Sequence, residues 1–439
     1  MAHKSDLIAD DILGYLKAQE EKSLLRFITC GSVDDGKSTL IGRLLWDSKL
    51  IFEDQLAALE SDSRKVGTQG GEIDFALLLD GLQAEREQGI TIDVAYRFFS
   101  TDKRKFIVAD TPGHEQYTRN MATGASTADV AVILIDGRKG ILTQTRRHSF
   151  ITSLLGIKHV VLAVNKMDLI DYDQAKFDSI VAEYREFSKD LGYSSITAIP
   201  LSALRGDNMI DASPNTPWYE GPSLLAHLET VQVEQGAIDK PFRMPVQCVN
   251  RPNLDFRGFS GLISSGSVKP GDAVRILPAG KNSMIEKIVT FDGELDEAVA
   301  GQSVTLCLAD EIDCSRGGLI ATADNPPESA DQFEASIVWL SDDALTVGRS
   351  YWLKLGPQMV SATVQEPKYT VNVNTMEQLA AKTLELNEIG VTQITTEKPI
   401  IFEAYNDNQA LGGFILIDKM TNATVGAGML NFSLRRAQN

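Results

Sequence analysis

The first half of the chain repeats short apolar runs separated by polar stretches with helical spacing. Five of these runs lie near residues 24–30, 105–109, 130–135, 160–164 and 196–201. Within them, apolar and polar positions do not alternate as they do in a strand with one solvent-facing side. Such runs are typical of strands that are buried on both faces of a parallel sheet. The pattern therefore predicts an α/β domain over residues 24–238, with a ligand at the carboxyl ends of its strands.

The pattern changes beyond residue 238, where apolar and polar positions begin to alternate. The alternating apolar positions are Phe242, Met244, Val246 and Cys248, and later Val304, Leu306 and Leu308. Turn and break sequences separate the runs, and they lie at 269–272, 291–294 and 325–329. Further apolar runs follow at 333–340, 351–355, 400–404 and 414–417. This pattern predicts two antiparallel β barrels, over residues 239–328 and 329–439.

Residues 1–23 precede the first predicted strand. Ile8, Ile12 and Leu16 recur at four-residue spacing with Leu13 beside them, which predicts a short amphipathic helix. Such an arm can pack against its own domain or dock on a partner subunit. The sequence favours neither arrangement over the other.

A glycine-framed loop follows the first predicted strand and precedes a helical run at 38–46. It fits the pattern G-x4-G-K-[ST] and consists of Gly31, Ser32, Val33, Asp34, Asp35, Gly36, Lys37 and Ser38, with Thr39 next in the chain. Glycines at both ends allow backbone N–H groups to approach phosphate closely. Lys37 supplies a cation to the β- and γ-phosphates, and Ser38 offers a hydroxyl to Mg²⁺. The loop predicts a nucleoside triphosphate site.

A second motif follows the predicted strand 105–109 and comprises Asp110, Thr111, Pro112 and Gly113. A carboxylate at that strand end can hold Mg²⁺ through water, and the N–H of Gly113 can reach a γ-phosphate. His114 comes next, where a side chain can orient a water molecule in line with the γ-phosphate. Thr91, in the charged stretch 84–93, can add a second hydroxyl to Mg²⁺ while the γ-phosphate is present. These positions predict hydrolysis as well as binding.

A third motif follows the predicted strand 160–164 and comprises Asn165, Lys166, Met167 and Asp168. Guanine presents N1–H and a 2-amino group on one edge, and the Asp168 carboxylate can accept both hydrogen bonds. Adenine lacks these donors and would leave the carboxylate unpaired, at a cost of about 1–3 kcal/mol. Lys166 can cover the base plane with its aliphatic stem, and Asn165 can tie this loop to the phosphate loop. A further base-binding loop is predicted after strand 196–201 and comprises Ser202, Ala203 and Leu204.

Composition narrows the class of protein. The 439 residues are 43% hydrophobic and 23% charged, and their pattern shows no apolar run of membrane-spanning length and no signal peptide at the start. The net charge of −18 disfavours broad binding to nucleic-acid backbones. The four cysteines have no metal-binding spacing and predict free thiols, at Cys30, Cys248, Cys307 and Cys314. We expect a cytoplasmic globular protein that makes no membrane contact and for which nucleic acid is a disfavoured partner.

The ordered motifs resemble those of the translation-factor class of GTPases. The matching stretches are 31–39, 85–92, 110–114 and 165–168, and the likeness continues at 257–272, which is similar to the second-domain barrel of elongation factors. The resemblance implies a mostly parallel P-loop GTPase domain followed by two antiparallel β barrels, with GTP or GDP and Mg²⁺ as ligands. It assigns the metal to Ser38, Thr91 and, through water, Asp110. It assigns catalysis to His114, Lys37 and Thr91.

Within that class the chain is similar to the large, GTP-hydrolysing subunit of sulfate adenylyltransferase. The stretches that suit this family are 31–38, 46–50 and 80–89. The resemblance implies that Val33 and Ile90 form an apolar gate on the water path to His114. It also implies GTP-stimulated adenylylation of sulfate by ATP, which yields adenosine 5′-phosphosulfate and pyrophosphate and takes place in a separate small subunit. That small subunit is the expected partner, in a heterodimer or a larger assembly.

Two other functions stay open on the sequence. One is an elongation-factor-like carrier of aminoacyl-tRNA, against which the net charge counts. The other is a scaffold that binds GTP and barely hydrolyses it, against which His114 and Thr91 count. The sequence itself fits a division of labour between subunits, because it contains no H-x-G-H motif and no S-G-G-x-D-S loop that would equip it for adenylyl transfer.

Overall fold

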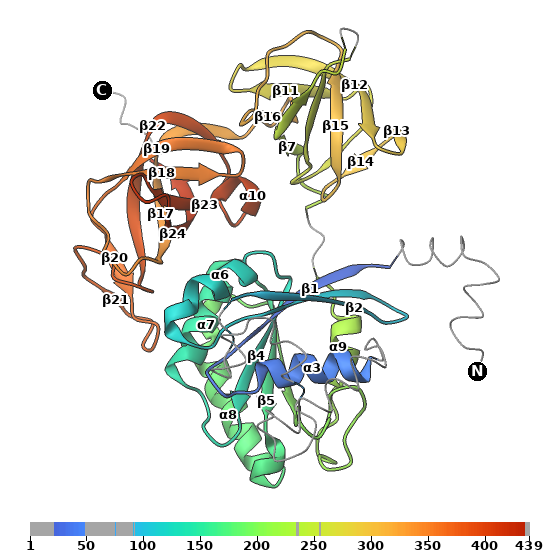
Figure 1. Ribbon diagram of the computed structural model, residues 1–439, viewed down its shortest axis with the longest axis vertical. Helices are drawn as coiled ribbons and strands as arrows, with labels where there is room; N and C mark the ends of the chain where they lie inside the picture. The colour runs from blue at the N-terminus through green and yellow to red at the C-terminus, as the bar shows by residue number, and fades with distance from the viewer. Residues whose placement is uncertain are drawn as a thin grey trace, which may run out of the picture. The chain divides into compact units, whose positions relative to one another are not determined.

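The computed structural model describes residues 22–48, 75, 91, 93–233, 237–253 and 256–434. The chain divides between Val233 and Glu234 into two compact units (Figure 1). The first unit is an α/β domain and the second contains two antiparallel β barrels, which confirms the predicted fold class. Residues 1–21 of the predicted arm and the gate residue Ile90 lie outside the described residues. The domain boundaries at 24, 239 and 329 stay predictions.

A six-stranded sheet forms the centre of the first unit, in the order β2-β3-β1-β4-β5-β6. Its strands are β1 (Leu24–Cys30), β2 (Ala95–Ser100), β3 (Lys105–Asp110), β4 (Val130–Asp136), β5 (His159–Asn165) and β6 (Ser195–Pro200). Strand β2 is antiparallel to β3, and all other neighbours are parallel. The five parallel strands agree with the five predicted apolar runs to within one residue at each end. Strand β2 was not predicted, because it lies at the sheet edge and has no continuous apolar run. Its Phe98 is exposed and its Phe99 is buried.

Helices cover both faces of this sheet. They are α3 (Lys37–Asp47), η2 (Glu115–Tyr117), α6 (Thr118–Ala125), α7 (Thr143–Leu154), η3 (Met167–Ile170), α8 (Gln174–Phe187), η4 (Lys189–Leu191) and α9 (Leu224–Thr230). Side-chain caps begin two of them: Asp173 accepts from backbone N–H groups of α8, and Ser223 accepts from one of α9. In the part of the chain that the structure describes, every helix is too short or too polar to cross a membrane.

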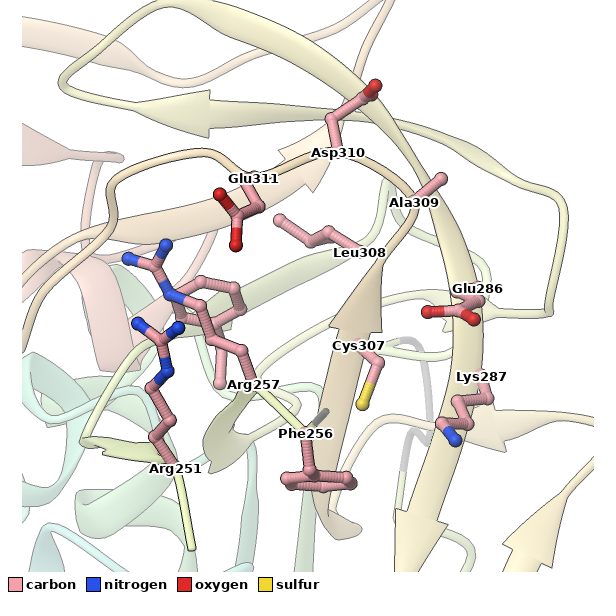
Figure 2. Close-up of a pocket in the computed structure, with 11 residues that line it drawn as sticks. Arg251, Phe256, Arg257, Glu286, Lys287, Cys307, Leu308, Ala309, Asp310 and Glu311 are labelled. Atoms are coloured by element: carbon pink, nitrogen blue, oxygen red, sulfur yellow. The ribbon is translucent and has the colours of Figure 1, made fainter. Parts of the chain in front are cut away.

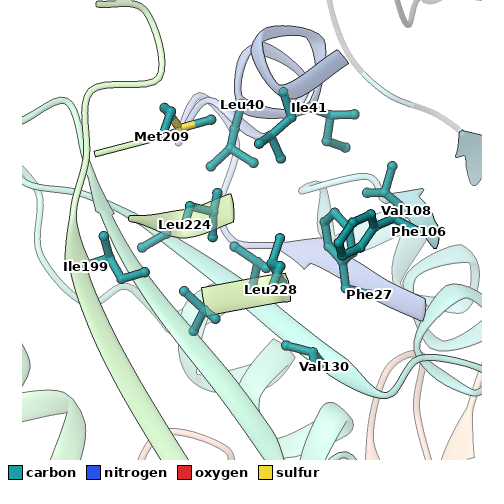
Figure 3. Close-up of a cluster of buried hydrophobic side chains, with 14 of the residues drawn as sticks. Phe27, Leu40, Ile41, Phe106, Val108, Val130, Ile199, Met209, Leu224 and Leu228 are labelled. Atoms are coloured by element: carbon teal, nitrogen blue, oxygen red, sulfur yellow. The ribbon is translucent and has the colours of Figure 1, made fainter. Parts of the chain in front are cut away.

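Successive residues of β1 pack against different helical layers. Phe27 belongs to a buried cluster that includes Leu40 of α3 and Leu228 of α9 (Figure 3). The next residue, Ile28, points to the opposite face, where its Cδ1 lies 3.4 Å from the position of a Cβ at Gly124 of α6. The strand is therefore buried continuously from Phe27 to Cys30, where both faces are covered. This packing fixes β1 and α3, the two elements that the phosphate loop connects.

The first barrel of the second unit is built from short antiparallel strands. They are β7 (Arg243–Pro245), β8 (Cys248–Asn250), β9 (Gly258–Leu262), β10 (Ser267–Val268), β11 (Ala273–Leu277), β12 (Lys281–Thr290), β13 (Gly293–Leu295), β14 (Ala298–Val299), β15 (Ser303–Leu308) and β16 (Leu319–Thr322). The main sheet has the order β7-β16-β11-β12-β15-β9-β8, with β13 paired to β12 and β10 to β14. An isolated bridge from Arg243 to Ser265 brings β7 back to the chain that follows β9.

The predicted alternation in this barrel holds with one exception. Phe242, Met244 and Val246 are buried as predicted, and so are the three predicted positions of β15. Cys248 was predicted to face the core, but it is exposed. The chain leaves β7 at Pro245 and enters β8 three residues later, which shifts the alternation by one position. Val249 therefore packs against the core in place of Cys248.

The second barrel is a closed ring of six strands. The elements are β17 (Glu328–Trp339), β18 (Ser350–Leu355), β19 (Gln358–Val364), β20 (Tyr369–Val371), β21 (Gln378–Leu379), β22 (Ile389–Phe402), α10 (Gln409–Gly412), β23 (Gly413–Asp418) and β24 (Thr424–Ser433). The ring runs β17-β24-β23-β18-β19-β22 and closes where β22 pairs with β17. Closure leaves these six strands without a free edge, which protects them from pairing with other chains.

An ion pair between a buried arginine and a half-buried glutamate connects the two barrels. The side chain of Arg243 is 2% exposed, and its Nε lies 2.8 Å from Oε1 of Glu403. The same guanidinium donates to the backbone carbonyl of Phe242 and to Oδ1 of Asn325, and Asn408 donates to the second oxygen of Glu403. A small apolar cluster from both barrels lies in the same unit and consists of Leu277, Leu319, Ala321, Ile401 and Leu411. These contacts hold the two barrels together as one unit.

Replacing Arg243 with methionine should destabilise the second unit by about 3 kcal/mol, because Glu403 loses its cation. Urea unfolding of the full chain should show a lower midpoint for the transition of the second unit and an unchanged one for the first. The double variant Arg243→Met, Glu403→Leu should recover part of the loss, since it also removes the unpaired carboxylate. A single variant as stable as the natural chain would contradict this role of the ion pair.

Candidate functional site

The parallel strands of the first unit bring the predicted motifs to one edge of the sheet. β1, β3, β4, β5 and β6 run in the same direction, so the loops that follow them lie at the same end. The phosphate loop follows β1, the motif 110–114 follows β3, the motif 165–168 follows β5, and residues 202–204 follow β6. This is the edge at which ligands bind in open parallel sheets.

The phosphate loop has a backbone shape that requires glycine at both ends. Gly31 has φ +149° and Gly36 has φ +93°. A Cβ at Gly31 would lie 2.6 Å from the carbonyl oxygen of Leu134, and one at Gly36 would lie 2.6 Å from Nδ2 of Asn165. Helix α3 begins directly afterwards at Lys37. Its first N–H groups have no acceptor within the helix and can bind an anion.

Lys37 lies inside this loop. Its Nζ donates to the carbonyl oxygens of Ser32 at 2.8 Å and Gly31 at 3.3 Å. Burial lowers the pKa of Lys37, and the carboxylates of Asp35 and Asp110 oppose that shift. The cation is therefore held in position by the loop that it serves.

Two further side chains hold the loop, and the motif analysis assigned neither this role. Gly31 N–H donates to Nδ1 of His148 at 3.1 Å, and Ser32 N–H donates to Oδ2 of Asp35 at 2.6 Å. Burial raises the pKa of Asp35 to about 6. Burial, with Lys37 and Arg147 nearby, lowers the pKa of His148 to about 3. His148 belongs to α7 and is far in sequence from every motif. The one feature that could have identified it is that it is a polar residue on the buried face of that helix.

Three oxygen-bearing side chains assigned to Mg²⁺ come together beside the loop. Oγ of Ser38 lies 3.0 Å from Oδ2 of Asp110 and 3.2 Å from Oγ1 of Thr91, and Thr29 contacts the other oxygen of Asp110 at 3.3 Å. When Ser38 donates its proton to Asp110, its lone pairs stay available to a cation. Neighbouring ligands of an octahedral Mg²⁺ lie about 3 Å apart. The Ser38–Thr91 separation therefore fits the predicted ion.

The motif 110–114 packs closely against the phosphate loop. A Cβ at Gly113 would lie 2.6 Å from Nζ of Lys37 and 2.9 Å from the backbone nitrogen of Val33, so only glycine fits there. Thr111 and Pro112 are buried, and the hydroxyl of Thr111 donates to the carbonyl of Thr29. His114 is half-buried, with its ring edge-on to Tyr117 at a centroid distance of 6.3 Å. Gly113 thus brings His114 next to the loop.

Asn165 joins three of the loops. Its Nδ2 donates to the carbonyl of Asp35 at 2.8 Å, and its Oδ1 accepts from the N–H of Ala203 at 2.9 Å. Lys166 has φ +62° and donates to the carbonyl of Asp34. Its Nζ also lies 3.1 Å from Oδ2 of Asp136. The predicted tie between the base motif and the phosphate loop is present in the structure.

Asp136, at the end of β4, is a site residue that the sequence analysis missed. It binds Arg138 through both carboxylate oxygens, at 3.0 and 2.7 Å, as well as Lys166. Burial works to raise the pKa of Asp136, but the hydrogen bonds from Arg138 and Lys166 hold it well below its usual range. A usable signal was present, because Asp136 follows an apolar strand just as Asp110 does.

The remaining predicted positions lie at the same edge with different exposure. Asp168 is half-buried at the start of η3, whereas Met167 is fully buried in the core. Oγ of Ser202 accepts from the N–H of Arg205, and the carbonyl of Leu204 accepts from Arg43. Val33 and Thr39 are half-buried. These positions are compatible with a base beside Asp168 and Lys166.

The second unit has a separate cavity of about 170 Å³ in its first barrel (Figure 2). Its charged lining residues are Arg251, Arg257, Lys287, Glu286, Asp310 and Glu311. Three cations and three carboxylates leave the cavity without a dominant charge. Burial raises the pKa of the Cys307 thiol in its wall. This cavity contains none of the residues assigned to the nucleotide.

The buried histidine makes the stability of the first unit depend on pH. Below its ordinary pKa of 6.5 the unfolded chain protonates His148, but the folded chain does so only near pH 3. Stability is therefore fully present above pH 6.5 and is lost as the pH falls, by about 2 kcal/mol at pH 5 from this group. His148→Asn, which cannot titrate, should reduce the loss measured by urea unfolding between pH 7 and 5. An identical pH dependence in both proteins would contradict the buried neutral imidazole.

Family models match segments of both units of this chain. Residues 22–249 match the family model of the elongation factor Tu GTP binding domain, and residues 332–431 match that of the GTP-eEF1A C-terminal domain-like family. The crystal structure of sup35 complexed with GDP covers 94% of this chain and 95% of its own, at 23% identity and a TM-score of 0.44.

Curated relatives match nearly the whole chain. The bifunctional enzyme NodQ of Rhizobium sp. (strain N33) is 62% identical over 436 residues, which are 99% of this chain and 68% of NodQ. Sulfate adenylyltransferase subunit 1 of Colwellia psychrerythraea is 58% identical over 434 residues, which are 99% of this chain and 93% of that protein. With 58% identity over 99% of this chain and 93% of that subunit, and with residues 22–249 matching a GTP-binding domain family, the chain belongs to the sulfate adenylyltransferase subunit 1 family of translation-factor-like GTPases.

Proposed function

We propose that this chain hydrolyses GTP to drive sulfate activation on a partner subunit, in the cytoplasm. The driven reaction converts ATP and sulfate to adenosine 5′-phosphosulfate and pyrophosphate. One observation carries the proposal: Asn165 joins the phosphate loop and residues 202–204 to the base motif, so that a single guanine nucleotide can contact all three. Membership of the subunit 1 family supports the choice of the driven reaction.

Recognition of GTP rests on the chain's own residues. The loop 31–38 and Lys37 bind the phosphates, and the Asp168 carboxylate accepts the two N–H donors of guanine. Mg²⁺, when bound by Ser38 and Thr91 and linked to Asp110 through water, neutralises part of the phosphate charge. The proximity of these three side chains supports that assignment.

Hydrolysis is assigned to the residues beside Gly113. Its N–H reaches the γ-phosphate, and His114 orients the attacking water in line with it. Val33 and Ile90 form the proposed apolar gate on the water path. His114 is half-buried and directly follows Gly113, which lies against Lys37, and this position supports the role.

Adenylyl transfer belongs to the partner in this proposal. GTP can influence the partner only through contacts that differ between the GTP and GDP states. Thr91 and Gly113 are the residues placed to form such contacts, because one lies against Ser38 and the other against Lys37. The small catalytic subunit is the proposed partner, in a heterodimer or a larger assembly.

His114→Ala should slow single-turnover GTP hydrolysis by about 10²-fold while leaving the Kd for GTP nearly unchanged, because the residue orients water and makes no ground-state contact. His159→Asn is a matched control, since His159 begins β5 at the opposite edge of the sheet. Equal hydrolysis rates for His114→Ala and the natural chain would remove His114 from the mechanism.

Coupling is tested with the full chain, a small subunit, ATP and sulfate. Phosphosulfate yield should be higher with GTP than with GDP or a non-hydrolysable analogue, and the isolated chain should make none. Thr91→Ala should abolish the stimulation and keep much of the GDP affinity, because the proposed Thr91 contact forms only with the γ-phosphate present. Equal yields with all three nucleotides would overturn the proposed function.

A further inference from the structure

We propose that His148 and Asp35 are positioning residues that hold Gly31 and Ser32 so that Lys37 is directed at the β-phosphate. The inference rests on the proposed function only in taking a guanine nucleotide as the ligand. It concerns two side chains that the phosphate-loop pattern does not require at these positions. Gly31 and Ser32 have four backbone hydrogen-bonding groups, which are two N–H groups and two carbonyls.

Gly31 and Ser32 use all four of these groups within the protein. Their two N–H groups donate to His148 and Asp35, and their two carbonyls accept from Lys37. The two side chains that hold the N–H groups therefore also set where the carbonyls point. Lys37 follows those carbonyls, because its buried ammonium needs both hydrogen bonds.

The arrangement has a cost that a purely structural contact would not justify. Gly31 N–H can donate to Nδ1 of His148 only when the proton of the neutral ring is on Nε2. That Nε2 is buried and has no hydrogen-bond partner among the described residues, and neither has Oδ1 of Asp35. Buried polar atoms without partners are rare in native structures and destabilise them. The other atoms of the same two side chains are both used on the phosphate loop.

The shape of the loop explains why side chains are needed there. Gly31 has φ +149°, and a Cβ would lie 3.0 Å from Oδ2 of Asp35 and 2.6 Å from a carbonyl of β4. Glycine gives the loop this shape but does not hold it, since glycine has the largest conformational freedom of any residue. The apparent affinity for nucleotide falls in proportion to the fraction of time that the loop spends outside the binding shape. His148 from α7 and Asp35 from the loop itself reduce that fraction.

The test measures the β-phosphate contribution to binding, as the ratio of the Kd for GMP to the Kd for GDP, in the full chain with Mg²⁺. His148→Leu keeps the bulk and removes the acceptor, and should reduce this ratio about tenfold, the scale of one lost buried hydrogen bond. His148→Asn places an oxygen where Nδ1 lies, and should restore most of it. All variants are measured at pH 7.5, so the comparison makes no assumption about the titration of His148 or Asp35.

Asp35 supplies an independent arm if His148→Leu fails to fold. Asp35→Asn and Asp35→Ala are both neutral, so their difference reports the oxygen acceptor and not the charge. The ratio for Asp35→Ala should be several-fold lower than that for Asp35→Asn. The inference would be overturned if His148→Leu and His148→Asn gave equal ratios and Asp35→Ala and Asp35→Asn did so too. It would also be overturned if the variants weakened the binding of GMP and of GDP equally. Either result would leave the proposed function intact. A natural chain that bound neither nucleotide would overturn both.

Discussion

The buried charge of Lys37 is the constraint on which the candidate site depends. Burial lowers the pKa of this lysine, so its charge must be stabilised by acceptors and carboxylates nearby. The carbonyls of Gly31 and Ser32 provide the acceptors, and Asp35 and Asp110 provide opposite charge. A cation placed in this way is desolvated before any ligand arrives, which strengthens its attraction for phosphate. The same loop would be unstable if any of these neighbours moved away.

The parallel sheet is what brings these neighbours together. Asp110 ends β3, Asn165 ends β5, and both reach the loop after β1 because all three strands run in the same direction. Asn165 and Asp35 are 130 residues apart, yet they share a buried hydrogen bond. In the second unit, the Arg243–Glu403 pair plays a comparable part across 160 residues. In both units a buried polar contact joins segments that apolar packing alone would leave free to shift.

The sequence predicts what depends on local pattern, and it misses what depends on distant partners. The five parallel strands are mostly apolar because they are covered on both faces, so their limits could be predicted to within one residue. The roles of His148 and Asp136 could not, since each is defined by contacts with loops that follow other strands. β24 was also missed, because glycines interrupt its apolar pattern. Gly428 is required there, since a Cβ would lie 2.2 Å from the ring of Phe414.

The pairing of β2 and β3 suggests how the proposed site can report which nucleotide it holds. Ala95 pairs with Asp110, so the segment that carries Thr91 and the motif that carries Gly113 leave the same end of one hairpin. Thr91 contacts Ser38, and Gly113 lies against Lys37, so both segments at the open end of the hairpin approach a single phosphate loop. A γ-phosphate bound at both points would restrain the two segments at once. Loss of the γ-phosphate on hydrolysis would release both segments together. The free energy available to a partner is limited to the difference in its affinity for the GTP-bound and GDP-bound states of the chain. The hairpin is therefore the element of the first unit best placed to carry that difference, because its other strand neighbour is β1, which leads into the phosphate loop itself.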